Sequence, residues 1–189
     1  MRLTTLTTAL ALTALGAALP AQAQQKLIPA QSEIAFVTRQ MGVPVEGSFS
    51  KFDAQVAFDP KQPTAAKIGF TIALGSAAIG TAETEVELRK ADWFDTAKFP
   101  QATFSSTAVK PTGAGKLEVT GLLSIKGSQQ PVTVPVVLAQ AGGVTTATGT
   151  FMLKRLDFKI GDGDWKDISV VANEVQVRFK LTLTGVAGW

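Results

Sequence analysis

The sequence contains no cysteine and no histidine among its 189 residues. Without Cys there is no disulfide, no thiolate nucleophile and no sulfur-ligated metal. Without His the chain lacks the commonest acid/base residue and the commonest metal ligand. These absences exclude a His-containing hydrolytic triad, a Cys or His zinc site and a haem held by either residue. Catalysis would have to use a carboxylate pair, a Ser-Lys dyad or a bound cofactor, and we predict no cofactor and no metal.

Tyrosine is also absent, whereas phenylalanine occurs 11 times. Phe supplies aromatic bulk without a hydroxyl that would need a buried hydrogen-bond partner. This usage suits a dry, ligand-holding interior, although a closed and fully packed core would use Phe in the same way. The net charge is only +3 and no basic run stands out, so nucleic acid is not a predicted partner.

The first residues predict a signal peptide. Arg2 precedes an apolar stretch, residues 6–19, and Ala21 and Ala23 then form the small-x-small pattern of a cleavage site. The apolar stretch is shorter than the roughly 20 residues that a membrane-spanning helix needs. We therefore expect residues 1–23 to be removed after Ala23, the protein to be periplasmic, and residues 24–189 to form one domain.

Apolar and polar residues alternate along most of the mature chain, which predicts strands with one dry and one wet face. The expected strands are residues 32–41, 45–58, 67–74, 104–109, 117–125, 132–138, 145–158 and 175–183. One short polar helix, residues 82–91, is expected between the third and fourth strands, lying across one end of the sheet with its charged face outward.

Eight long strands of this kind favour an all-β fold, an eight-stranded antiparallel lipocalin-like barrel. Such a barrel has no free edges and is just wide enough to hold one small ligand. A two-sheet sandwich is the alternative. Pro135 predicts that the sixth strand lies at an edge or contains a bulge, because proline cannot donate to a ladder.

Residues 93–104 combine four large aromatic side chains with a proline, which is typical of a corner between a helix and a strand. We expect Trp93 and Phe94 to pack at the rim of the barrel and Phe104 to point into its interior. Trp93 is also a candidate gate for the cavity.

The chain resembles the YceI family of periplasmic, lipocalin-like polyisoprenoid-binding proteins over essentially its whole mature length. Five pieces in the same order and spacing carry the resemblance: residues 45–49 with Phe52, 58–60, 93–95 with 99–104, 121–127 with 131–132, and 154–158. The resemblance implies an antiparallel barrel whose apolar interior accepts an isoprenoid chain, with no catalytic residues. Many members carry a His before the second strand, where this chain has residues 40–43, so a head-group role of that His cannot be carried over.

The residues expected to face the interior, and to line the ligand-binding bore, share the apolar face of their strands. They are Phe36, Phe52, Phe58, Phe70, Ile72, Phe104, Val119, Leu123, Val134, Val136, Phe151, Phe179 and Leu181. The candidate rim or head-group residues are Trp93, Phe94, Arg89 and Arg155. An isoprenoid or fatty amphiphile is the expected ligand, and affinity should grow with the buried chain length.

Two arginines are candidates for binding a phosphate or phenol head group, since Arg binds phosphate bidentately. Arg155 is expected two residues from Asp157 on one strand face, and Arg89 lies near Asp92 at the end of the helix. A structural ion pair is the alternative for either Arg. Residues 162–164 resemble a calcium loop only in part, since further acids at the required spacing are missing, so we expect a solvated turn.

Two rival functions follow from the same patterns. Phe179 and Leu181 share a face with the C-terminal Trp189, which would also suit a small outer-membrane β-barrel, but too few Trp and no Tyr are present for its aromatic girdles. Stable membrane insertion is therefore not expected. An enzyme using a buried carboxylate is the other rival, and no pair of acids stands out to serve it.

A homodimer is a candidate assembly.

Overall fold

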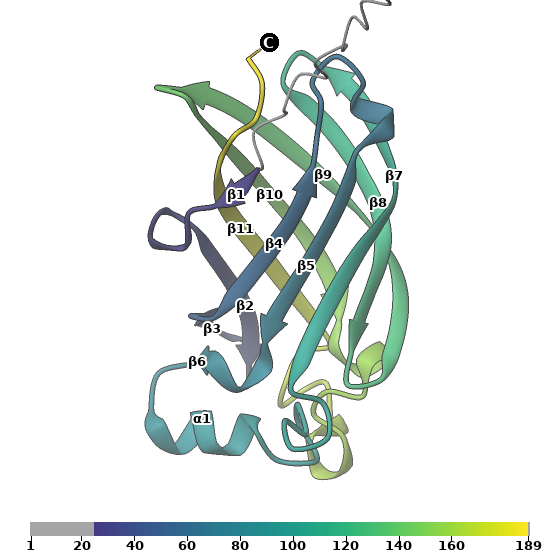
Figure 1. The fold of residues 1–189 in the computed structure, drawn as a ribbon. Coiled ribbons are helices and arrows are strands. Elements are labelled where there is room, and N and C mark those ends of the chain that lie inside the picture. The colour runs from purple at the N-terminus through teal and green to yellow at the C-terminus, as the bar shows by residue number, and fades with distance from the viewer. Residues whose placement is uncertain (1–24, 189) are drawn as a thin grey trace, which may run out of the picture.

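The computed structural model describes residues 25–188, so the predicted signal peptide lies outside the described residues. In the described part of the chain one antiparallel sheet of eleven strands curls around an elongated interior (Figure 1). The strands are β1 (Lys26–Leu27), β2 (Glu33–Gln40), β3 (Val43–Phe49), β4 (Phe52–Ala57), β5 (Lys67–Ala73), β6 (Ala77–Ala78), β7 (Gln101–Gly113), β8 (Lys116–Ile125), β9 (Ser128–Ala141), β10 (Val144–Lys154) and β11 (Glu174–Thr184).

The helices are short. They are the α-helix α1 (Ala82–Leu88) and the 3₁₀ turns η1 (Pro29–Gln31), η2 (Pro63–Ala65), η3 (Leu74–Ser76), η4 (Arg155–Phe158) and η5 (Gly163–Lys166). The strand order is β4-β5-β7-β8-β9-β10-β11-β2-β3-β6, and β1 pairs with β11. The all-β class is therefore confirmed, and a lipocalin-like barrel describes the curled sheet broadly.

The predicted number of eight strands is wrong, in part because residues 45–58 form two strands. β3 pairs with β2, whereas β4 pairs with β5, so the run changes partner at Ser50 and Lys51. The backbone N–H groups of these two residues donate to Ser76, to its carbonyl at 3.3 Å and to its Oγ at 3.1 Å respectively. The two-residue strands β1 and β6 account for the remaining difference, since so short a segment shows no alternation.

Strand β10 ends earlier than the sequence pattern predicts. The pairing of β10 with β11 stops at Lys154 and Glu174. Beyond that pair, the backbone N–H groups of Arg155 and Leu156 donate to Asn173, to its carbonyl at 2.8 Å and to its side-chain Oδ1 at 3.1 Å. The chain therefore turns into η4 instead of continuing as a strand. The prediction that Arg155 and Asp157 share a strand face is wrong, because both residues lie in η4.

Pro135 lies in a strand that has neighbours on both sides over much of its length, but at the proline itself only β8 is paired, so the predicted edge position holds at this point of the strand. It pairs with Glu118 of β8, while the ladder between β9 and β10 begins one residue later, at Val136 and Gly149. The proline thus lies where β9 separates from β10. A strand that is central along part of its length can tolerate proline at such a point because fewer ladder hydrogen bonds are required there.

The sheet closes only partly. Its ends in the strand order are β4 and β6, and no ladder joins them within residues 25–188. Gln25, just before β1, bonds to Phe58, just after β4. The Gln25 Nε2 donates to the Phe58 carbonyl at 2.6 Å, and its Oε1 accepts from the Phe58 N–H at 3.0 Å. A side-chain amide therefore replaces one missing step of backbone pairing.

Helix α1 lies across one end of the curled sheet, at the bottom of Figure 1, between β6 and β7 in the chain. Thr81 caps it by accepting from the Thr84 N–H at 3.3 Å, and Glu83 and Glu85 lie in its first turn, where the helix dipole favours negative charge. The helix is shorter than the predicted 82–91. After Leu88 the chain turns back on itself, so that the Phe94 N–H donates to the Leu88 carbonyl at 3.0 Å.

Candidate functional site

Two adjoining cavities fill the interior of the curled sheet. We call the one lined by α1 residues the lower chamber, with a volume of about 490 Å³, and the other the upper chamber, with a volume of about 140 Å³. Five residues line both chambers: Ile34, Ile72, Leu123, Phe151 and Val177. Because the chambers share this belt of side chains, they adjoin one another, and we call the two together the bore.

The upper chamber is almost wholly hydrocarbon. Thr145 is the one polar residue in its lining. The Thr145 hydroxyl accepts a hydrogen bond from Gln140 Nε2 at 3.2 Å, so this hydroxyl is already paired. The period-two pattern explains the composition: β8 turns Leu117, Val119 and Leu123 inward, whereas the side chains between them face outward. Apart from this hydroxyl, the lining of the upper chamber consists of hydrocarbon side chains.

Twelve of the thirteen residues predicted to face the bore line one chamber or both. They are Phe36, Phe58, Phe70, Ile72, Phe104, Val119, Leu123, Val134, Val136, Phe151, Phe179 and Leu181. Phe52 lies in neither lining, although it is half-buried at the start of β4 and pairs across to Ile72. The sequence pattern omitted other lining residues, among them Thr38, Val56 and Val171. Thr38 could have been found, because it continues the inward face of Ile34 and Phe36.

Three strand glycines leave room for phenylalanine rings of the bore to lie directly over a neighbouring strand. A Cβ built on Gly47, Gly121 or Gly149 would overlap the ring of Phe36, Phe104 or Phe179 respectively. Phe36 pairs directly with Gly47 across β2 and β3, and Phe179 with Gly149 across β11 and β10. Glycine inside a strand often marks such a close approach. The missing Cβ atoms therefore let each ring lie over a strand and leave the bore free.

The lower chamber is larger and less uniform. Apolar side chains from β2, β8, β10 and the turn after α1 provide most of its wall. Its polar lining residues are Thr38, Gln40, Glu83, Thr84, Glu87 and Arg155. Along the inward face of β2, apolar Ile34 and Phe36 are followed by polar Thr38 and Gln40 toward the α1 end. A similar change occurs where β10 ends, because apolar Leu153 is followed by Arg155 in η4.

Trp93 and Phe94, predicted at the rim, are buried in the lining of the lower chamber. The Trp93 ring is tilted by 52° against Trp165 with the centroids 5.4 Å apart, and Phe94 packs against Phe49 at 6.1 Å. The segment after α1 therefore contributes wall side chains to the chamber. Arg89, in contrast, is an exposed C-cap residue of α1 and belongs to neither lining.

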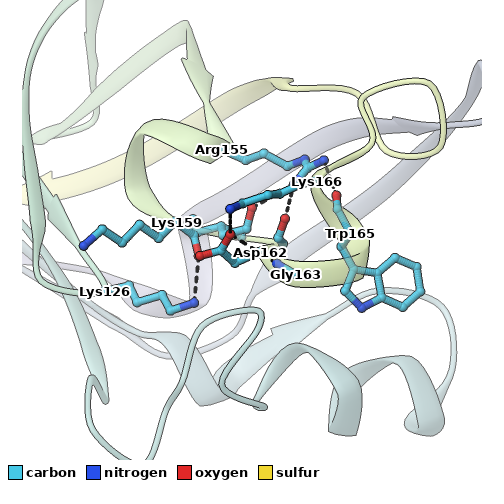
Figure 2. A network of polar contacts seen from close by, with 9 residues as sticks. Lys126, Arg155, Lys159, Asp162, Gly163, Trp165 and Lys166 are labelled. Carbon is cyan, nitrogen blue, oxygen red and sulfur yellow. Dashed lines mark hydrogen bonds and ion pairs between the residues drawn. The ribbon is translucent and has the colours of Figure 1, made fainter.

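Arg155 is not a rim residue: it is 2% exposed, and its guanidinium is fully committed to backbone carbonyls. Nε donates to Ala172 at 3.1 Å, and Nη1 donates to Ile160 at 2.9 Å and Gly161 at 2.7 Å. Nη2 donates to Val171 at 2.8 Å and to Trp165, which lies beside it in Figure 2, at 2.7 Å. Arg carries five N–H donors, so none is left for a phosphate. Burial lowers the pKa of Arg155 from its ordinary value. The predicted head-group role is therefore replaced by a structural one.

A surface network holds the η5 loop beside Arg155 (Figure 2). Lys126 Nζ donates to the Lys159 carbonyl at 2.7 Å, and Lys166 pairs with Asp162 at 2.9 Å. The hydrogen bond from Lys166 is the main cause that lowers the pKa of Asp162, whereas burial lowers the pKa of Lys126. Asp162 also accepts from the Gly163 N–H, which agrees with the predicted solvated turn.

No group of three or more Asp, Glu, His or Cys side chains within residues 25–188 is placed to hold a metal ion. The helices of this part of the chain are all too short or too polar to cross a membrane.

Comparisons with known proteins agree with this architecture. A family model described as a YceI-like domain matches residues 26–183. Protein YceI of Escherichia coli O157:H7 is 44% identical over 96 residues, 51% of this chain and 50% of that protein, so the chain spans about half the length of the curated relatives it matches.

Solved structures cover more of the chain. BcnA of Burkholderia cenocepacia is 44% identical with a TM-score of 0.80, over 82% of this chain and 98% of BcnA. A polyisoprenoid binding domain from Saccharophagus degradans, implicated in plant cell wall breakdown, has a TM-score of 0.70 over 85% of this chain and 98% of that domain. At 17% identity, this second likeness concerns the fold alone.

Proposed function

The chain belongs to the YceI-like domain family, and from this premise we propose that it binds a polyisoprenoid or a similar amphiphilic lipid, carrying or sequestering it without catalysis. The observation that carries the proposal is the pair of adjoining, largely apolar chambers, which share five lining residues. The lower chamber alone falls within the range of about 300–1,000 Å³ that small-molecule sites occupy. The ligand class named for the Saccharophagus degradans domain fits an interior of this kind.

Affinity for linear prenols should rise with each added isoprene unit and then level off when the bore is full. Each buried methylene adds at most about 0.8 kcal/mol, so the rise reports how much chain enters the dry interior. Titration of the purified protein with a C10 to C40 prenol series checks this expectation. A series with no dependence on chain length contradicts the proposed bore.

The placement of the residues that could form a Ser-Lys dyad or supply a catalytic carboxylate supports a binding role. Ser124 points away from the bore on β8, and the Lys126 ammonium is occupied by the Lys159 carbonyl, so the two do not form a dyad aimed at a ligand. Glu118 and Glu174 are exposed. Turnover of a bound lipid that disappears on replacing one of these acids would contradict the non-enzymatic assignment.

We propose the periplasm as the compartment, following the leader predicted at residues 1–23. The outer faces of β8 and β11 support an aqueous setting, because they carry Lys116, Glu118, Arg178 and Lys180. After expression with its leader, the protein should appear in the osmotic-shock fraction with an N-terminus at Gln24. Recovery only with detergent would instead favour the outer-membrane alternative.

A further inference from the structure

The hairpin that joins β4 and β5 extends beyond the ladder that holds it to β7. The pairing of β5 with β7 ends at Gly69 and Ser105, whereas the pairing of β4 with β5 continues to Ala57 and Lys67. The turn of this hairpin lies at the top of Figure 1, at the opposite end of the molecule from α1. We call residues 56–68, which project past the last pair with β7, the hairpin tip.

Side chains hold the hairpin tip to the elements on both of its sides. On the β7 side, the Ile68 N–H donates to Ser106 Oγ at 2.9 Å, in the place of a further ladder pair. On the other side, the Gln25 amide bonds both the N–H and the carbonyl of Phe58, and Gln25 directly precedes β1, which pairs with β11. These side-chain hydrogen bonds can break while every ladder of the sheet stays paired.

The hairpin tip covers the upper chamber. Val56, Phe58 and Ile68 line this chamber, and all three side chains are half-buried. On β8 and β9, in contrast, the lining residues Val119 and Val134 are only 4% and 6% exposed. Segments with few fully buried apolar contacts are the ones that open at the lowest free-energy cost. The tip is therefore the part of the chamber wall that opens most readily.

The turn within the hairpin tip is stiff. Pro60 and Pro63 have a fixed φ, and the Gln62 N–H donates to the Asp59 carbonyl at 2.9 Å. Two prolines and an internal hydrogen bond limit the conformations that the turn can adopt. Opening therefore moves the tip as a body and does not unravel it.

We propose that the hairpin tip is a flap over the upper chamber, that the Gln25 amide and the Ser106 hydroxyl are its two latches, and that the lipid enters and leaves the bore past this flap. The inference rests on the proposed lipid-binding function and adds the route and the device that controls it. Because the latches favour the closed flap in the free and in the loaded protein alike, weakening them raises the open population of both. Entry and exit then accelerate together, and the affinity is kept.

The test measures exchange of geranylgeraniol that carries a fluorescent anthraniloyl group, by stopped-flow mixing, with unlabelled geranylgeraniol as the competitor. Gln25→Ala should raise the association and dissociation rate constants about tenfold each, since two hydrogen bonds of ordinary net strength shift the opening equilibrium by about this factor. Ser106→Ala removes one bond and should raise both rate constants about threefold. In both variants the Kd should stay within about twofold of the wild-type value.

Gln130→Ala is the matched control, because its Nε2 also donates to a backbone carbonyl, that of Asp157 in η4, at 3.4 Å. It should leave both rate constants unchanged. Unchanged exchange in Gln25→Ala overturns the flap. A faster dissociation with an equal loss of affinity also overturns it, because the amide would then stabilise the bound state without controlling the route.

Hydrogen–deuterium exchange of the ligand-free protein tests the flap without any lipid. In Gln25→Ala the amides of residues 56–68 should exchange faster, while those of β8 to β11 keep their wild-type protection. No increase in the tip, or an equal increase over the whole sheet, contradicts the flap. Failure of the wild-type protein to bind any prenol instead refutes the proposed function, so the two failures are distinguishable.

Discussion

Replacing Arg155 with Met should lower the free energy of unfolding by roughly 3–5 kcal/mol, because each buried polar group that loses its partner costs about 1–3 kcal/mol. The substitution leaves five backbone carbonyls, from Ile160 to Ala172, without their donors, and buried polar groups left unpaired are costly. The loop between β10 and β11 pairs with the sheet only through the bridge between Gln40 and Val171 and the backbone hydrogen bonds beside it, and the guanidinium joins the two ends of the loop by bonding carbonyls from Ile160 to Ala172. Urea unfolding, monitored by tryptophan fluorescence, measures the loss.

Two further variants separate the hydrogen bonds from the charge. Arg155→Lys keeps the positive charge but offers only three donors, so an intermediate loss is expected. Arg178→Met is the matched control: its side chain is 46% exposed and its ion pair with Glu46 spans 3.4 Å, which predicts a change below about 1 kcal/mol. Unfolding of Arg155→Met at the wild-type urea concentration would contradict the structural role.

The role of Arg155 also marks the limit of what the sequence could predict. Phe151, Leu153 and Arg155 keep the same inward alternation, so the pattern extends the strand through Arg155 and suggests a mouth residue. The strand ends because β11 begins only at Glu174 and Asn173 captures the next two N–H groups. Five converging carbonyls are a tertiary feature without a local sequence signal.

The wall of the bore was predictable for the opposite reason. Inward positions such as Val119, Leu123 and Val134 repeat every second residue, and pairing between neighbouring strands preserves that face. The family resemblance added that the interior holds a ligand, a point on which Phe composition alone was undecided. The sequence pattern does not predict the division of residues 45–58 into two strands, because both halves keep the alternation. Only the change of pairing partner separates them.

Gly149→Ala should reduce the affinity for long prenols by at least about tenfold and destabilise the fold by about 1–3 kcal/mol, the usual range for overpacking. The new Cβ overlaps the Phe179 ring and comes within 2.8 Å of the Pro135 carbonyl. Because the strand backbone blocks retreat on one side, the ring is displaced into the upper chamber, whose volume is only about 140 Å³. Prenol titration and urea unfolding measure the two effects.

Two comparisons isolate the ring as the cause. Gly69→Ala introduces the same methyl group in β5, where its nearest neighbours are carbonyls at 3.9 Å, so binding should not change and stability should stay equal or rise slightly. Gly149→Ala should also cost much less when Phe179→Leu is already present, since the smaller side chain frees the space over the glycine, although contact with the Pro135 carbonyl remains. The difference between the two backgrounds is the coupling between Gly149 and Phe179. Equal costs in both backgrounds would show that the glycine serves the backbone alone and that the open bore does not depend on it.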